Sequence, residues 1–94
     1  MRGGILKVIK KSKEFELFSK EKLKSSILGA SIDNKTVLNE SDLNLILNEI
    51  LKKLRNIRGE NGITSIYEIR AVTIEVLKEF KFVGIVKEYL SLNK

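Results

Sequence analysis

The chain has 94 residues and a formal net charge of +6, and it contains no cysteine and no histidine. The length suits a single domain over residues 1–94. The two missing residue types exclude disulfides, zinc fingers, thiol nucleophiles and imidazole acid–base catalysis. No apolar run is long enough to span a membrane, and the residues from Met1 to Gly4 do not read as a signal peptide. We therefore expect a cytoplasmic protein.

The positive charge has several explanations. Nucleic acid, a phosphorylated small molecule, an acidic partner and a lysine-rich solvated surface all fit it. The lysines spread along the whole chain, and Lys10, Lys11 and Lys13 form the densest cluster. No long basic tail suggests a nucleic-acid arm, so the charge alone does not choose among these partners.

The N-terminal segment alternates apolar and basic residues. One face of a strand would carry Ile5, Lys7, Ile9 and Lys11, and the other Leu6, Val8 and Lys10. After the polar pair Ser12 and Lys13, a second alternation runs through Phe15 and Leu17. The pattern predicts a β-hairpin.

Two helices are predicted to follow the hairpin. Ser19 is a candidate N-cap for a helix over residues 20–29, and residues 30–37 are predicted to form a loop. Asn39 or Ser41 then opens a second helix that ends near Gly59. Its apolar residues recur at three and four positions, at Leu43, Ile46, Leu47, Ile50, Leu51 and Leu54.

Residues 59–62 are predicted to form a turn before two further helices. Ser65 and Glu68 have the spacing of a capping box ahead of a helix that carries its apolar face at Ile69, Val72, Val76, Leu77 and Phe80. A break near Lys81 precedes a short last helix through Val83, Val86, Tyr89 and Leu90. The expected fold is α+β, with an N-terminal β-hairpin packed on a bundle of about four helices.

The stretch from Val8 to Leu23 resembles the opening of the ATP-cone, a small regulatory nucleotide-binding domain. The family pattern has a valine, two basic residues, a turn with glycine, an acidic residue, a phenylalanine and a lysine before an aliphatic residue. The matching positions are Val8, Lys10, Lys11, Glu16, Phe18, Lys22 and Leu23. The turn glycine is missing, because Ser12 and Lys13 occupy its place.

A second family signature lies in the C-terminal half. Ser65 and Ile69 match its cap and its aliphatic position, and residues 83–87 match its final run, with Gly84 for the usual alanine and Lys87 for the usual arginine. Glu88 stands where an aromatic residue is common in the family. The order of elements agrees with the ATP-cone over nearly the whole chain.

The resemblance implies a site for ATP or dATP, with Mg²⁺ held mainly by the phosphates. The implied nucleotide-binding residues are Val8, Lys10, Lys11, Glu16, Phe18, Ser19, Lys22 and Lys87. The lysines would attract the triphosphate, and the helix beginning after Ser19 would offer backbone N–H donors. Glu16 would contact the base or ribose, and Val8 and Phe18 would enclose the base.

Ordinary structural roles stay open for each of these residues. Val8 and Phe18 also suit a hydrophobic core, the lysines a solvated surface, and Ser19 a simple helix cap. Arg70 follows Ile69 and suits a phosphate or a second nucleotide, although an ion pair with a glutamate one helical turn away is the preferred interpretation.

The chain has no Walker A sequence, dinucleotide-binding glycine motif or nucleophile elbow, so we expect no enzyme activity and no metal site in the protein itself. The resemblance implies a non-catalytic sensor that signals to a separate protein, such as a ribonucleotide reductase or a transcriptional regulator, and a homo-oligomer is compatible with it. Two alternatives stay open: a small basic nucleic-acid-binding protein, and a degenerate ATP-cone that serves as an interaction scaffold.

Overall fold

The computed structural model describes residues 6–59 and 62–92, which form a small sheet and four helices. The elements in chain order are β1 (Lys7–Ile9), β2 (Phe15–Leu17), α1 (Lys20–Asp33), α2 (Glu40–Arg58), β3 (Ile63–Ser65), α3 (Ile66–Glu79) and α4 (Val83–Leu92). The α+β class with an N-terminal hairpin and a helical bundle is confirmed.

The sheet contains the predicted hairpin and one strand that the sequence did not reveal. Its order is β2-β1-β3, and β1 pairs with β2 antiparallel and with β3 parallel. The described part of the first strand is shorter than the predicted run, and Ile5 lies outside the described residues. Residues 59–62 were predicted as a turn leading directly to a helix, but β3 lies between the turn and α3. The turn positions 60 and 61 lie outside the described residues.

The hairpin turn uses a lysine where the ATP-cone pattern has glycine. The amide of Lys13 donates to the carbonyl of Lys10 at 2.9 Å, and the amide of Lys10 donates to the carbonyl of Glu14 at 2.8 Å. Lys13 has φ 70°, in the left-handed region. This is the three-residue loop in which a turn is followed by a left-handed residue, a position that glycine favours.

Helix α1 begins as predicted but ends later. The Ser19 side chain accepts a hydrogen bond from the amide of Lys22 at 3.2 Å, so the predicted N-cap is confirmed. The predicted end at Gly29 is wrong, because the helix continues to Asp33. Ala30 and Ser31 are buried, and this part of α1 packs against α4. Tertiary burial therefore extends the helix past a residue that is unfavourable in helices.

The caps of α2 and α3 also follow the sequence. Asn39 accepts from the amide of Asp42 at 2.8 Å, and Ser65 accepts from the amide of Glu68 at 3.1 Å. The carboxylate of Glu68 accepts from Thr64 at 2.6 Å and from Arg58 at 2.8 and 2.9 Å. The acidic member of the predicted capping box therefore joins α2, β3 and α3.

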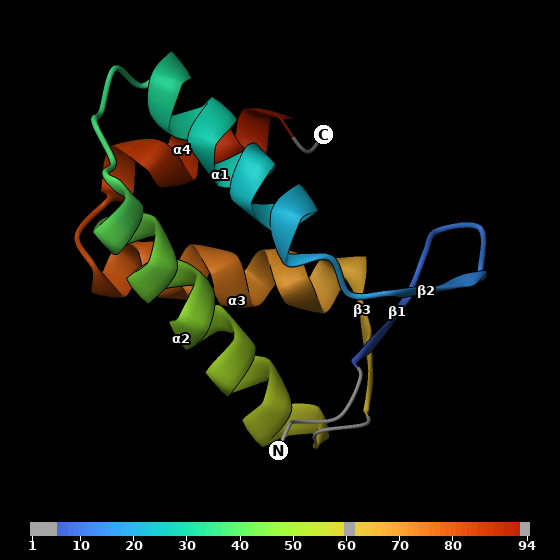
Figure 1. Ribbon diagram of the computed structural model, residues 1–94. Helices are drawn as coiled ribbons and strands as arrows, with labels where there is room; N and C mark the ends of the chain where they lie inside the picture. Colours follow the sequence, from blue (N-terminus) through green and yellow to red (C-terminus); the bar gives the residue numbers. More distant parts are fainter. Residues whose placement is uncertain (1–5, 60–61, 93–94) are drawn as a thin grey trace.

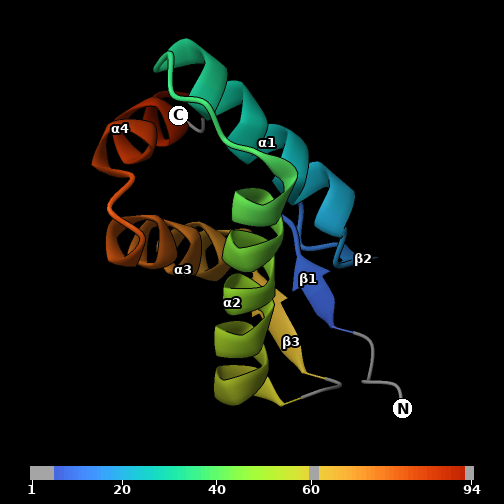
Figure 2. The ribbon, with the colours of Figure 1, turned by 60° about the vertical axis from the view of Figure 1, so that its left-hand side comes forward.

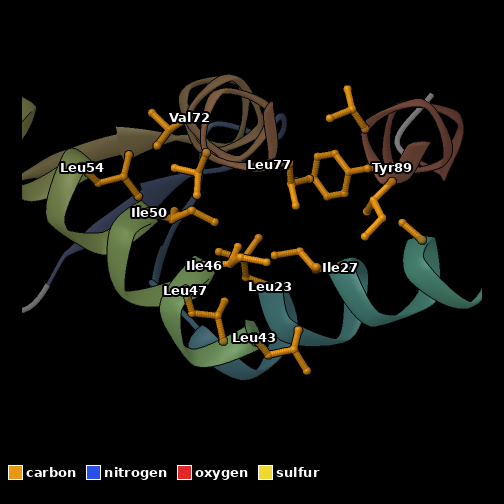
Figure 3. Packing of buried hydrophobic residues seen from close by; sticks show 14 of the residues in the cluster. Leu23, Ile27, Leu43, Ile46, Leu47, Ile50, Leu54, Val72, Leu77 and Tyr89 are labelled. Atoms are coloured by element: carbon orange, nitrogen blue, oxygen red, sulfur yellow. The ribbon is translucent and has the colours of Figure 1, made fainter. Parts of the chain in front are cut away.

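The hydrophobic core lies between the helices and beneath the sheet. Figure 3 shows side chains from α1, α2, α3 and α4 meeting in its centre. The core is almost entirely aliphatic, and Tyr89 is the aromatic member among its buried residues. Val8 of β1 and Leu6, which directly precedes β1, are buried, which agrees with the predicted alternation.

The hairpin extends away from the helical bundle, as Figure 1 shows. Helix α1 lies next to α4, and α2 packs mainly on α3. The turned view in Figure 2 shows β1 and β3 side by side, close to α2. None of the helices in the described part of the chain has the length and apolar character needed to cross a membrane.

Candidate functional site

A pocket of about 180 Å³ lies where the hairpin meets the bundle. Side chains from β1, β2, α1, α3 and α4, together with the segment between β2 and α1, form its walls. Its lining residues are Val8, Glu16, Leu17, Phe18, Ser19, Lys22, Leu23, Ser26, Ile66, Ile69, Arg70 and Tyr89.

Helix α1 presents one face to this pocket. Ser19, Lys22, Leu23 and Ser26 follow the spacing of three, four and seven residues that aligns side chains along one side of a helix. Ser19 is the N-cap. The first backbone N–H groups of a helix have no partner within it, and the helix dipole makes this end positive. The pocket therefore borders a position suited to an anion.

The sheet contributes an apolar wall and a carboxylate. Val8 and Glu16 are direct partners in the antiparallel register, so both point to the same face of the sheet. Val8 is buried, and Glu16 is partly buried. Lys22 Nζ lies 3.5 Å from Glu16 Oε1. The lysine side chain is 76% exposed, so it is free to change partners at little energetic cost.

Helices α3 and α4 close the opposite side with Ile66, Ile69, Arg70 and Tyr89. The guanidinium of Arg70 lies over the ring of Tyr67, 5.9 Å from its centroid. Burial raises the pKa of the Tyr89 hydroxyl, while a hydrogen bond with Thr73 and the charge of Arg70 act in the opposite direction. The Tyr89 side chain is therefore neutral and largely buried, and the charge of Arg70 lies close enough to act on its hydroxyl.

The predicted ion pair between Arg70 and a glutamate is wrong. The positions four residues away on either side are Ile66 and Ile74, and neither offers a carboxylate. Arg70 lies instead on the pocket wall. It adds a second cation to the pocket wall, from α3, whereas Lys22 comes from α1.

Five of the eight sequence-predicted residues come together in the pocket: Val8, Glu16, Phe18, Ser19 and Lys22. Three do not line it: Lys10, Lys11 and Lys87. Lys10 follows β1 and lies 3.9 Å from Glu14, and Lys11 is exposed in the hairpin turn. Lys87 is exposed, two residues before the pocket residue Tyr89. Residues two apart point to nearly opposite sides of a helix, so Lys87 faces away.

Several lining residues were not singled out as site residues by the sequence. Ser26 continues the helical spacing of Ser19 and Lys22, so periodicity alone could have found it. Arg70 and Tyr89 come from helices whose approach to the hairpin is set by tertiary packing. The apolar stripes of α3 and α4 indicate only which side of each helix is buried.

The comparisons with known proteins point to one family. The family model described as the ATP cone domain matches residues 6–94. A search of curated proteins gives no match. The ATP cone is, in general, a nucleotide-binding regulatory domain. Because the match covers nearly the whole chain, this protein belongs to the ATP cone domain family.

Proposed function

We propose that this chain binds ATP or dATP in the pocket between its hairpin and its helices, and that it acts as a non-catalytic regulatory domain. One observation carries the proposal. The residues Val8, Glu16, Phe18, Ser19 and Lys22, which match the family or cap the adjacent helix, line a single pocket. An apolar wall, a carboxylate, a cation and a helix N-terminus in one place suit a nucleoside that carries phosphates.

We expect only the nucleoside part of the nucleotide to fit inside the pocket. The pocket volume of about 180 Å³ lies below the range of about 300–1,000 Å³ usual for small-molecule sites. The base and ribose would therefore enter, with Val8 and Phe18 against the base. Glu16 would accept a hydrogen bond from the adenine amino group or a ribose hydroxyl.

The triphosphate would extend out of the pocket over the N-terminus of α1. Lys22 would exchange Glu16 for a phosphate, and Arg70 would add a second positive charge from α3. Lys10 follows β1, two residues after Val8, and its amide donates to the carbonyl of Glu14 across the hairpin at 2.8 Å. Lys10 and Lys11 would meet the outer phosphates, and Mg²⁺ would be held mainly by the nucleotide.

Binding would report the nucleotide state to another protein. The family resemblance to the regulatory modules of ribonucleotide reductases and of their transcriptional repressor supports a partner of that kind, on a separate polypeptide in the cytoplasm. The hairpin forms one wall of the pocket and extends from the bundle (Figure 1), so a bound nucleotide would contact it directly and could change its position.

Thermal unfolding with ATP, dATP, GTP, CTP or no ligand, each with and without Mg²⁺, tests the proposal. Ligand at 100 times Kd stabilises the folded state by about 2.7 kcal/mol, which corresponds to a rise in Tm on the order of 10 °C for a domain of this size. We expect this rise with ATP and dATP and much smaller rises with GTP and CTP.

Two lysines on α1 give a matched pair of variants. Lys22→Ala should reduce the rise with ATP, because Lys22 lines the pocket. Lys24→Ala should leave it unchanged, because Lys24 pairs with Glu40 at 3.1 Å and does not line the pocket. Equal rises for the parent chain and Lys22→Ala would contradict the site. No rise with any nucleotide would favour the degenerate scaffold.

A further inference from the structure

The sheet has a second face, opposite the nucleotide pocket, that helices do not cover. Lys7, Phe15, Leu17 and Ile63 line a hollow of about 290 Å³ on this side, which we call the outer sheet face. Phe15 is 59% exposed, Leu17 61% and Ile63 45%. Neighbouring exposed apolar side chains around a hollow are typical of an interaction surface.

The strand register explains why these residues gather. Lys7 of β1 pairs with Leu17 of β2 on one side and with Ile63 of β3 on the other. The three side chains therefore form a row across the sheet, with a cation between two aliphatic residues. Phe15 lies two residues from Leu17, on the same side of β2. The outer sheet face thus combines an apolar surface with a central positive charge.

The charges around the outer sheet face are unbalanced. The two carboxylates of the hairpin are paired elsewhere, Glu14 with Lys10 at 3.9 Å and Glu16 with Lys22 at 3.5 Å. Lys7, Lys11 and Lys13 have no ion-pair partner among residues 6–59 and 62–92. A second copy of the chain would bring the same lysines to this surface, and like charges in an interface are unfavourable. A partner surface that has carboxylates beside apolar side chains would complement the outer sheet face.

We propose that the outer sheet face binds an acidic amphipathic segment of a partner protein. The apolar side chains of the segment would cover Phe15, Leu17 and Ile63, and its carboxylates would pair with Lys7 and the turn lysines. Glu16 and Leu17 line both this hollow and the nucleotide pocket. Strand β2 therefore separates the two sites, and, given the proposed nucleotide function, it couples occupancy of one to affinity at the other.

Defined peptides test the docking proposal. One labelled amphipathic peptide is built from leucine and glutamate, and its counterpart has lysine at every glutamate. We expect fluorescence anisotropy at physiological salt to show binding of the glutamate peptide and not of the lysine peptide. Phe15→Ser and Ile63→Ser should each weaken binding roughly tenfold, since each removes apolar contact area. Lys7→Glu should shift the preference toward the lysine peptide.

Ile32→Ser is the matched control, because Ile32 is also an exposed apolar residue, 70% exposed on α1, but lies outside the hollow. It should bind the glutamate peptide like the parent chain. Equal binding of both peptides, no binding of the glutamate peptide, or the same loss in Ile32→Ser would overturn the proposal. A dimer in sedimentation equilibrium that Phe15→Ser dissociates would also overturn it, in favour of a second copy.

The two proposals fail in different ways. Phe15 and Ile63 do not line the nucleotide pocket, so Phe15→Ser and Ile63→Ser should retain the Tm rise with ATP. If the parent chain shows no such rise, the proposed nucleotide function is wrong, and the peptide-binding experiment still tests the docking proposal. Peptide affinity should change on addition of ATP, and an unchanged affinity in a chain that binds ATP would overturn the coupling through β2.

Discussion

Lys13 adopts an unfavourable backbone conformation at the tip of the hairpin. Its φ of 70° places a side chain in the left-handed region, which costs about 1–2 kcal/mol for residues other than glycine. The ATP-cone pattern has glycine in this turn, so the sequence already indicated a departure here. The structure identifies Lys13, and not Ser12, as the residue that adopts the conformation.

Lys13→Gly should stabilise the fold by about 0.5–1 kcal/mol, because relief of the left-handed side chain exceeds the extra entropy that glycine gives the unfolded chain. Urea unfolding at 25 °C measures the change. Lys13→Ala keeps a Cβ at the position and should show no such gain. A Lys13→Gly variant that is less stable than the parent would contradict the assignment of strain to this residue.

Arg70 is a pocket cation for which the sequence favoured an ion pair with a glutamate and kept contact with a phosphate as the second interpretation. Under the proposed function, Arg70→Gln should weaken ATP binding by about tenfold, or about 1.4 kcal/mol, because it removes a positive charge from the pocket wall that would attract the phosphates. Isothermal titration calorimetry measures the affinity. Arg55→Gln, an exposed position on α2 away from this pocket, is the control. Equal affinities for both variants would show that Arg70 does not contact the nucleotide.

The elements were predicted to different degrees, for physical reasons. The hairpin and α2 were recognised because each carries its own periodic pattern, and the caps Ser19 and Ser65 because capping is local. Strand β3 was missed because it has three residues and its partner β1 is distant in the sequence. The extension of α1 to Asp33 depends on contact with α4, which no local pattern contains.

Glu68 joins three of these elements, and its environment gives the fold a pH dependence. Hydrogen bonds from Arg58 and Thr64 favour its charged form and lower its pKa below the ordinary value of 4.5. A carboxylate with a lowered pKa stabilises the fold at pH values above its unfolded pKa, and the contribution is lost as the pH falls through its folded pKa.

Glu68→Gln should therefore reduce stability at pH 7 and flatten the loss of stability below about pH 5. Urea unfolding between neutral and acidic pH measures both effects. Glu14→Gln is the control, because the Glu14 side chain is 74% exposed and its carboxylate lies 3.9 Å from Lys10. A parallel pH dependence in the parent chain and Glu68→Gln would contradict the role of this carboxylate.

At the scale of the molecule, local sequence patterns are enough to predict the core but only part of the candidate site. Alternation and helical spacing located the core residues of each element and the α1 side of the pocket, at Ser19 and Lys22. They did not place Arg70 and Tyr89 in the pocket, although contact of Arg70 with a phosphate was one interpretation, because the approach of α3 and α4 to the hairpin depends on how the whole core packs. Lys10, Lys11 and Lys87 do not line the pocket, and contact of Lys10 and Lys11 with a nucleotide stays a prediction.

Two leucines on α2 test how strongly the fold depends on its aliphatic core. Leu47 is 1% exposed and Leu45 is 57% exposed. Leu47→Ala should destabilise the fold by about 2–5 kcal/mol through loss of buried contacts and formation of a cavity. Leu45→Ala should change stability by no more than about 0.5 kcal/mol. Similar effects of the two substitutions in urea unfolding would contradict the packing.

The parallel pairing of β1 with β3 determines when the pocket can form during folding. The two hairpin strands are joined by a short loop. In contrast, β2, α1 and α2 separate β1 from β3 in the sequence, so the pairing of β1 with β3 closes a long loop. Such non-local contacts form late, because the closure entropy of a long loop must first be overcome. Because the pocket needs β1, β2, α1, α3 and α4 together, we expect it to be absent from the folding transition state. Nucleotide should therefore slow unfolding and leave the folding rate unchanged.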